Sequence, residues 1–243
     1  MDTESDKLIE EKLKEIRSFF ENNADPAIVA KYSRYFKDGY IGYGINQNVF
    51  ENQRDKWFKE WNSFTIDDYL SLGDQLILSG KFEDISIAIA FISLKKEEYS
   101  INVFNYMEKW LESFTNWANT DVMCMLVLSY FINEKIVKPE NFIEWTSSQS
   151  KWTRRAVPVT FFEAVKAGED PVQYFAIIEP IMLDKEEDVQ KGIGTFLRES
   201  WKKRPEITED FLSKWKDTCG RKIIQYATEK MDKEYRKKFR RSK

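Results

Sequence analysis

The sequence contains no histidine among its 243 residues. Imidazole is the general base of serine and cysteine triads and the commonest ligand of catalytic zinc and iron, so sites of these kinds are excluded. Any chemistry must use carboxylates, phenols, amines or bound water instead. We therefore expect neither a metal ion nor a cofactor.

Glycine, proline and cysteine are scarce. The chain has 9 glycines and 6 prolines, whereas tryptophan, tyrosine and phenylalanine make up 15% of it. This combination disfavours turn-rich β-sandwiches and favours long helices with bulky side chains between them. Cys124 and Cys219 stand alone, without the paired spacing of a zinc site or a disulfide framework. We predict an all-α protein with reduced, partly buried cysteines.

Long hydrophobic runs are also lacking. No stretch approaches the roughly 18 apolar residues of a membrane-spanning helix, and residues 1–17 are charged without the apolar core of a signal peptide. We therefore expect a cytoplasmic protein that does not contact a membrane. The net charge of −3 gives no sign of nucleic-acid binding, which would need cations gathered on one face.

Apolar residues recur at helical spacing along most of the chain. Grouped in pairs, the predicted helices form units of roughly 35 residues. This length predicts a HEAT-like helical-repeat solenoid with a concave groove. The alternative is a non-repetitive helical bundle. We expect one such domain over residues 1–231 and a basic, mobile tail over 232–243. The predicted helices span 8–20, 26–36, 46–61, 66–79, 82–95, 101–114, 117–133, 138–149, 151–167, 171–183, 186–203, 206–217 and 219–230.

Two segments admit more than one interpretation. Residues 39–44, with three glycines, superficially resemble a phosphate-binding loop, but no strand precedes them and no Gly-Lys-Ser or Gly-Lys-Thr follows, so we predict a connecting loop. Residues 85–90 alternate as a strand would, yet the length of the segment and its acidic start at Glu83 and Asp84 favour a buried helix.

The helix over residues 117–133 holds the main candidate for chemistry. It is apolar on nearly every side and should be central. Asp121 lies one turn after Trp117, and an indole beside a carboxylate could receive a cationic planar ligand. The alternative is structural: Asp121 would offset the unpaired amides of the first helical turn while Trp117 packs in the core.

Cationic candidates occur in three places. Trp152, Arg154 and Arg155 are the first group of candidate DNA contacts. The consecutive Arg154 and Arg155 point about 100° apart, so we expect one of them to face the groove. A cationic ridge and a basic patch mixed with aromatic residues are further candidates for phosphate binding, although solvated helix faces often have the same composition. The ridge comprises Lys191, Thr195, Arg198 and Lys202, and the patch comprises Lys31, Arg34 and Lys37 with Tyr32, Tyr35 and Phe36.

Four segments in the same order resemble the AlkD-type DNA alkylation repair proteins, a family of HEAT-like DNA glycosylases and non-catalytic relatives. The resemblance covers most of the chain and implies a helical-repeat fold that binds duplex DNA in its groove. The segments are residues 30–32 with 43–45, residues 117–121, residues 152–156 and residues 190–199.

The resemblance also implies roles for single residues. Asp121 corresponds to the family's catalytic carboxylate and Trp117 to its aromatic neighbour, while Tyr32 and Arg155 correspond to a tyrosine and an arginine of the cleft. Thr195 departs from the pattern, because family glycosylases have a second cleft tryptophan there. That departure weakens the expectation of efficient base excision.

The implied chemistry agrees with the absence of histidine. A purine alkylated at N3 or N7 is already cationic and leaves its sugar without strong acid catalysis, so one carboxylate that stabilises the sugar cation and orients water suffices. The implied partner is duplex DNA, bound by a monomer. Two alternatives stay open: a non-catalytic module for distorted or branched DNA, and a solenoid whose cationic ridge binds an acidic peptide.

Overall fold

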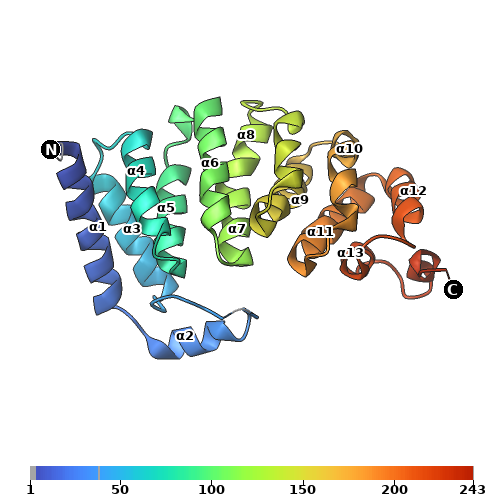
Figure 1. Ribbon diagram of the computed structural model, residues 1–243, viewed down its shortest axis with the longest axis horizontal. Helices are drawn as coiled ribbons and strands as arrows, with labels where there is room; N and C mark the ends of the chain where they lie inside the picture. The colour runs from blue at the N-terminus through green and yellow to red at the C-terminus, as the bar shows by residue number, and fades with distance from the viewer. Residues whose placement is uncertain (1–3, 38, 243) are drawn as a thin grey trace. The chain divides into compact units, whose positions relative to one another are not determined.

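A computed structural model describes residues 4–37 and 39–242 (Figure 1). Within these residues the protein has thirteen α-helices, connected by short 3-10 helices and one π-helical turn, and no β-strand. None of these helices is long and apolar enough to cross a membrane. The all-α fold class is therefore confirmed.

The chain forms two compact units. The first contains the residues up to Tyr99 together with Ser113–Val122, and the second contains Ser100–Glu112 together with the residues from Met123 onward. In a helical-repeat protein each repeat contacts mainly its neighbours, so even a single domain can divide into two units in this way. The single domain predicted over residues 1–231 is therefore not tested and stays a prediction.

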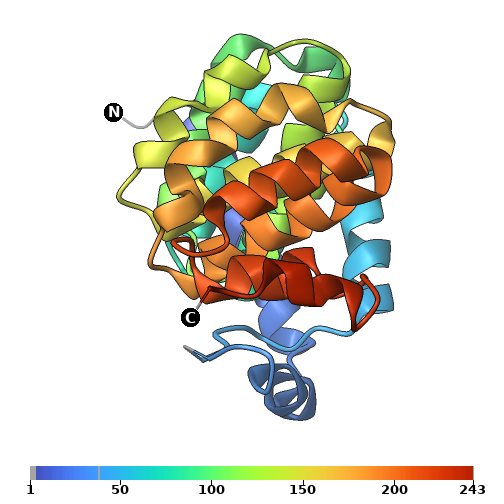
Figure 2. The same ribbon diagram turned by 90° about the vertical axis from the view of Figure 1, so that its right-hand side faces the viewer.

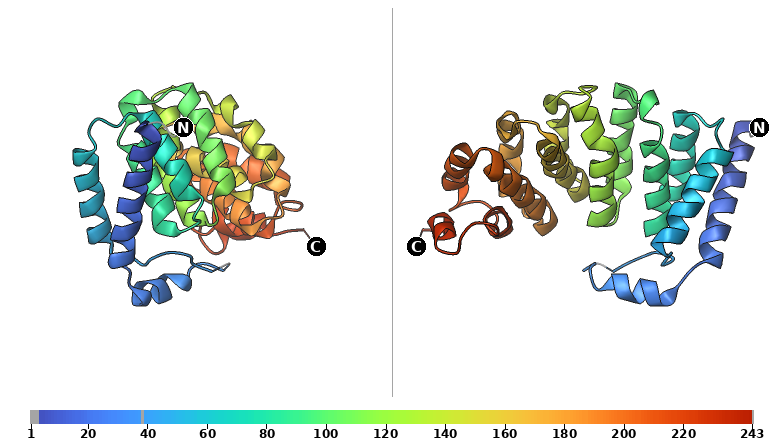
Figure 3. Two further views of the ribbon diagram at one scale, coloured as in Figure 1. Left: turned by 60° about the vertical axis from the view of Figure 1, so that its left-hand side comes forward. Right: turned by 180° about the vertical axis from the view of Figure 1, so that it is seen from behind.

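In the first unit, several helices begin at a residue whose side chain caps them. The Asp25 carboxylate accepts a 2.8 Å hydrogen bond from Ala27 N, with Pro26 in the first helical turn, and Thr65 and Asp68 form a capping box. α1, α3, α4 and α5 lie side by side, and α2 lies across the ends of α1 and α3 (Figure 3). The helices are α1 (Glu4–Asn22), α2 (Pro26–Ser33), α3 (Gln47–Glu60), α4 (Ile66–Ile77), α5 (Phe82–Ser93) and the start of α7 (Trp117–Met123), with 3-10 helix η1 (Lys96–Glu98).

The core of the first unit is centred on α5. Every residue of this helix from Glu83 to Ile92 is buried except Ser86, which confirms a buried helix rather than a strand. Trp61 and Tyr69 contact Phe91 with ring centroids 5.5 and 4.9 Å apart. Burying such rings contributes about 2 kcal/mol or more each, so this cluster holds α3, α4 and α5 together.

The glycine-containing segment 39–44 is a loop, as predicted, and it surrounds an internal carboxylate. Glu83 is 4% exposed and accepts backbone hydrogen bonds from Tyr43 N (2.8 Å), Gly44 N (2.8 Å) and Ile45 N (3.1 Å). The Tyr40 hydroxyl donates a further bond of 2.9 Å, and burial together with this carboxylate raises the pKa of Tyr40. The loop amides thus bind a protein carboxylate rather than a phosphate.

Two helices predicted in the second unit are not continuous. The predicted helices 138–149 and 171–183 are instead series of short turns that begin at Pro139, Pro171 and, after Glu179, Pro180. The α-helices are α6 (Ile101–Ser113), α8 (Ser129–Asn133), α9 (Lys151–Ala167), α10 (Phe175–Ile178), α11 (Glu187–Lys203), α12 (Pro205–Trp215) and α13 (Arg221–Ala227). The 3-10 helices are η3 (Pro139–Phe142), η4 (Glu144–Ser147), η5 (Pro171–Tyr174), η6 (Glu179–Leu183) and η7 (Tyr235–Phe239).

The predicted helix 117–133 is present but not regular. α7 continues into a π-helical turn, Cys124–Leu128, and then into α8. Such turns are rare and often occur near functional sites. The boundary between the two units, after Val122, falls just before this turn.

Two glycines let α11 approach a helix on each side. A Cβ at Gly192 would lie 3.3 Å from Pro158 Cγ in α9, and one at Gly194 would lie 2.6 Å from Tyr226 Cβ in α13. Figure 2 shows this end of the second unit, with α11 in orange and α13 in red. The Gly-Ile-Gly sequence is therefore explained by close helix packing.

The basic tail is folded over the residues that the structure describes, so the expectation of a mobile tail was wrong. Phe239 is 1% exposed, and the Tyr235 hydroxyl donates to both carboxylate oxygens of Glu209, at 2.7 and 2.8 Å. Arg241 Nη2 donates a 2.7 Å bond to the carbonyl oxygen of Cys219. The sequence suggested mobility because charge dominates the segment, whereas the single apolar Phe239 anchors it.

Candidate functional site

In the first unit, the start of α7 presents Trp117 at the surface. Its side chain is 37% exposed, and its Nε1 donates a 3.4 Å hydrogen bond to the carbonyl oxygen of Tyr35. This exposure rules out the alternative in which Trp117 packs in the core. Asp121 follows one turn later and is half-buried, so its carboxylate is neither sealed in the core nor fully solvated.

The residues between them fix the helix in place. Asn119 is fully buried, and its Nδ2 donates to Ser86 Oγ at 3.0 Å and to the carbonyl oxygen of Phe82 at 3.3 Å. Thr120, also buried, donates from its hydroxyl to the carbonyl oxygen of Asn116. These bonds tie α7 to α5, so the residues on the outer face of α7 are held on a rigid support.

An aromatic cluster connects Trp117 with Tyr32. The Trp117 indole stacks on Phe36 with centroids 5.6 Å apart and planes 20° apart, Phe36 contacts Tyr40 at 5.3 Å, and Tyr40 contacts Tyr32 at 5.8 Å. Two predicted site residues thus belong to one surface, and Lys31 Nζ lies 5.8 Å above the Tyr32 ring. Sequence reasoning missed the part played by Tyr40, although aromatic residues are dense between 32 and 43.

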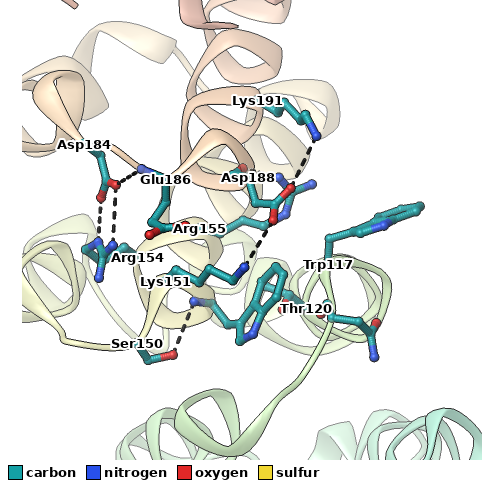
Figure 4. A network of polar contacts seen from close by, with 12 residues as sticks. Trp117, Thr120, Ser150, Lys151, Arg154, Arg155, Asp184, Glu186, Asp188 and Lys191 are labelled. Atoms are coloured by element: carbon teal, nitrogen blue, oxygen red, sulfur yellow. Dashed lines mark hydrogen bonds and ion pairs between the residues drawn. The ribbon is translucent and has the colours of Figure 1, made fainter. Parts of the chain in front are cut away.

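In the second unit, three cations surround Asp188 in the first turn of α11 (Figure 4). Lys151 Nζ and Lys191 Nζ lie 3.5 and 3.4 Å from its carboxylate, and Arg155 Nη1 donates to its backbone carbonyl oxygen. Arg155 is 7% exposed, and its Cγ lies near the position that a Cβ on Gly192 would occupy. We call Lys151, Arg155, Asp188 and Lys191 the Asp188 cluster. Lys151 was not among the predicted residues.

Two residues predicted to contact DNA, Arg154 and Trp152, make contacts within the protein. Arg154 forms an ion pair with Asp184 (Nε to Oδ2, 2.5 Å; Figure 4). Its Nη1 also donates to the carbonyl oxygens of Ser148 and Gln149. Trp152 is 6% exposed, with Lys151 Nζ 4.4 Å from its ring centroid. Arg154 and Arg155 diverge as helical geometry requires, but the burial of Trp152 and the pairing of Arg154 argue against DNA contacts.

The predicted cationic ridge on α11 is largely neutralised. Arg198 pairs with Glu199 and with Glu229, and Lys202 Nζ lies 2.6 Å from Glu199 Oε1. Thr195 is half-buried and lies between Lys191 and Arg198 in the sequence of α11. The ridge is therefore a surface of mixed charge, which favours neither phosphate nor an acidic peptide at Arg198 and Lys202.

A family model described as DNA alkylation repair enzyme matches residues 16–231. The chain belongs to the DNA alkylation repair family. Among solved structures, a predicted DNA alkylation repair enzyme from Enterococcus faecalis aligns with a TM-score of 0.72 over 87% of this chain and 98% of that chain, at 17% sequence identity. Identity this low shows the fold alone, and no curated protein matches the chain.

Membership of the DNA alkylation repair family confirms the resemblance drawn from the four segments and indicates an enzyme with a role in DNA repair. The helical-repeat fold is confirmed by the same family and by the Enterococcus structure. Among residues 4–37 and 39–242, no group of three or more cysteine, aspartate or glutamate side chains is placed to hold a metal ion. The roles of Asp121, Trp117, Tyr32 and Arg155 stay predictions.

Proposed function

We propose that this protein is a DNA glycosylase that hydrolyses the N-glycosidic bond of N3- or N7-alkylated purines in duplex DNA, with Asp121 as its catalytic carboxylate. One observation carries the proposal. In this member of the DNA alkylation repair family, Trp117 is exposed and stacks on Phe36, and Asp121 lies half-buried one helical turn after it.

The proposed reaction needs one negative charge and a water molecule. An alkylated purine is cationic, so the C1′–N bond breaks with its electron pair going to the base, which leaves as a neutral molecule. Positive charge then develops on the sugar, and the Asp121 carboxylate stabilises it at close range. Water adds to C1′ and loses its proton to the carboxylate or to solvent, which completes hydrolysis.

DNA binding is assigned to surfaces of both units. The exposed faces of Trp117 and Tyr32 would pack against the sugar-phosphate backbone of the damaged nucleotide. The Asp188 cluster supplies positive charge for phosphates through Lys151 and Lys191, and Arg155, which is 7% exposed, adds charge beneath them without direct contact. Phosphate contacts carry no sequence information, so we expect binding that depends on salt and little on sequence. We further propose that the protein acts as a monomer in the cytoplasm.

The test is release of free 7-methylguanine or 3-methyladenine from methylated duplex DNA. Asp121→Asn keeps the shape of the side chain and removes its charge, and we expect it to lower the single-turnover rate at least about 100-fold. Asp210→Asn makes the same change at an exposed position of α12 and should keep the full rate. No release above buffer, or equal release by Asp121→Asn, would refute the catalytic proposal.

A second candidate function is suggested by Thr195. This position, half-buried in α11, holds no aromatic ring where the resemblance implies a cleft tryptophan. The alternative is a helical module that binds distorted or branched DNA without breaking a bond. Salt-dependent binding to such DNA with no released base would select this function over the glycosylase.

A further inference from the structure

The second unit contains a pocket that the proposed function does not use. It lies between α13 and the C-terminal segment with η7, and its volume is about 760 Å³. This is within the usual range for ligand sites, about 300–1,000 Å³. Five of its nine lining residues are cations and none is acidic; the cations are Lys216, Arg221, Arg236, Arg240 and Arg241. We call it the C-terminal cationic pocket.

The wall of this pocket is held in place by the folded tail. The buried Phe239 lines it, and Arg241 is fixed by its 2.7 Å bond to the carbonyl oxygen of Cys219. Ser242 N donates a 2.6 Å hydrogen bond to Asp217 Oδ1. These bonds hold the last described residues against the segment between α12 and α13, so the arginines of the tail form part of a built surface.

Most of the positive charge in the pocket has no counter-charge within it. Of the five lining cations, Lys216 pairs with Asp217, and two cations outside the pocket hold the neighbouring ion pairs, Lys237 with Glu234 and Lys238 with Glu209. Within the part of the chain that the structure describes, the guanidinium groups of Arg221, Arg236 and Arg240 are exposed and form no close ion pair, although Arg236 is near enough to Asp232 to help lower the pKa of that carboxyl. Like charges placed together repel, and an anion bound among them relieves that repulsion.

The lining determines which anion fits. Guanidinium groups bind phosphate oxygens in pairs, and the side chains of Gln225 and Thr228 add polar groups. The one aromatic ring that lines the pocket, Phe239, is 1% exposed, so no ring face is offered for stacking with a base. These features favour the charged backbone of a nucleic acid over its bases.

We propose that the C-terminal cationic pocket binds consecutive phosphates of the DNA backbone, through a surface built entirely from residues 216–241 and independent of Asp121. The inference rests on the DNA-binding part of the proposed function and not on base excision. Its contribution is affinity and salt dependence, since phosphate contacts position a protein on DNA without reading the sequence.

The test compares two double variants of equal charge change in the full chain. Arg236→Gln with Arg240→Gln removes two lining cations and spares Arg241, which fastens the tail. Lys230→Gln with Lys233→Gln removes two exposed cations that do not line the pocket. Fluorescence anisotropy with a labelled undamaged duplex gives Kd at several salt concentrations, and thermal melting checks that both variants fold.

For the arginine variant we expect Kd to rise about tenfold. The slope of the logarithm of the binding constant against the logarithm of the salt concentration should decrease in magnitude by about 2. Each phosphate that the protein no longer neutralises lowers this slope by about 0.9, and the variant loses two such contacts. The lysine variant should change both values much less. Equal effects of the two variants, or no DNA binding by the unmodified chain, would overturn the proposal. A pocket that binds only inorganic pyrophosphate, measured by calorimetry, would also overturn the DNA assignment.

The two proposals fail in distinguishable ways. If the unmodified chain binds DNA through the pocket but releases no methylated base, the glycosylase fails and the pocket stands. If base release depends on Asp121 and the arginine variant binds DNA as the lysine variant does, the glycosylase stands and the pocket fails.

Discussion

The Trp117 indole lies stacked on the Phe36 ring, with centroids 5.6 Å apart and planes 20° apart. One ring begins α7 and the other follows α2, so the orientation of the exposed indole depends on a residue 81 positions earlier in the chain. Because Trp117 is 37% exposed, this stack determines which part of the indole is left for a ligand.

Loss of this stacking should reduce excision without unfolding the protein. An aromatic pair contributes about 0.5–1.5 kcal/mol beyond its buried area, so we expect Phe36→Leu to lower the single-turnover rate roughly 2- to 10-fold. Phe58→Leu is the matched control, because Phe58 is also half-buried in the first unit and stacks on Tyr69 outside this cluster. Equal rates for the two variants would show that the stack does not position Trp117.

Asp188 should limit DNA affinity, because its carboxylate offsets the charge of Lys151 and Lys191. Asp188→Asn keeps the backbone carbonyl that accepts from Arg155 and removes the negative charge, so we expect DNA binding to tighten a few-fold at low salt and less at high salt. Glu187→Gln, an exposed change of equal charge in the same helical turn, is the control. Anisotropy at two salt concentrations measures both, and weaker binding by Asp188→Asn would contradict the prediction.

Glu83 should be a main source of stability for the loop that carries Tyr40. Its carboxylate accepts three backbone hydrogen bonds, and removing it leaves those donors unpaired. We expect Glu83→Ala to lower the free energy of unfolding by about 3 kcal/mol, equivalent to roughly 6–12 °C in Tm for a chain of this size. Glu97→Ala, at an exposed position, should change Tm by less than about 2 °C, and a similar small change for Glu83→Ala would disprove the assignment.

Asp84 should make stability depend on pH. Its side chain is fully buried, and burial raises its pKa above the usual value, while the nearby Ser79, Arg17 and Lys81 offset only part of this effect. A raised pKa means that the folded state binds the proton more tightly than the unfolded state. The stability from this group is therefore complete below the unfolded pKa of about 3.9 and is lost as pH rises through the folded pKa.

The neutral variant Asp84→Asn tests this dependence. We expect it to melt at a higher temperature than the unmodified chain at about pH 7, and we expect this difference to shrink as the pH falls, because a raised pKa favours the protonated form of Asp84 in the folded state. Asp67→Asn, in the first turn of the neighbouring helix α4 but exposed, controls for loss of charge near a helix start. A lower melting temperature for Asp84→Asn at pH 7 would show that the charged form is stabilised instead.

Features that depend on neighbouring residues were predictable from the sequence. Asp25 with Pro26 marks the start of α2, and the predicted helix 151–167 coincides with α9. The spacing of Trp117 and Asp121 places both on one side of a helix, because the angle between successive residues in a helix is constant. Such features could be found because helical hydrogen bonds and side-chain directions involve residues only a few positions apart.

Pairings between distant segments were decided by the tertiary structure. The predicted charge of Arg198 is cancelled by Glu229, which lies 31 residues away, and the basic tail is anchored because Phe239 becomes buried. The Trp117 side chain could have been core or surface until Phe36 packed against it. Composition and periodicity therefore determined most of the helices and the face that each of their residues occupies. Packing decided which charges are neutralised and which side chains stay accessible, because a partner's position depends on how the whole chain folds.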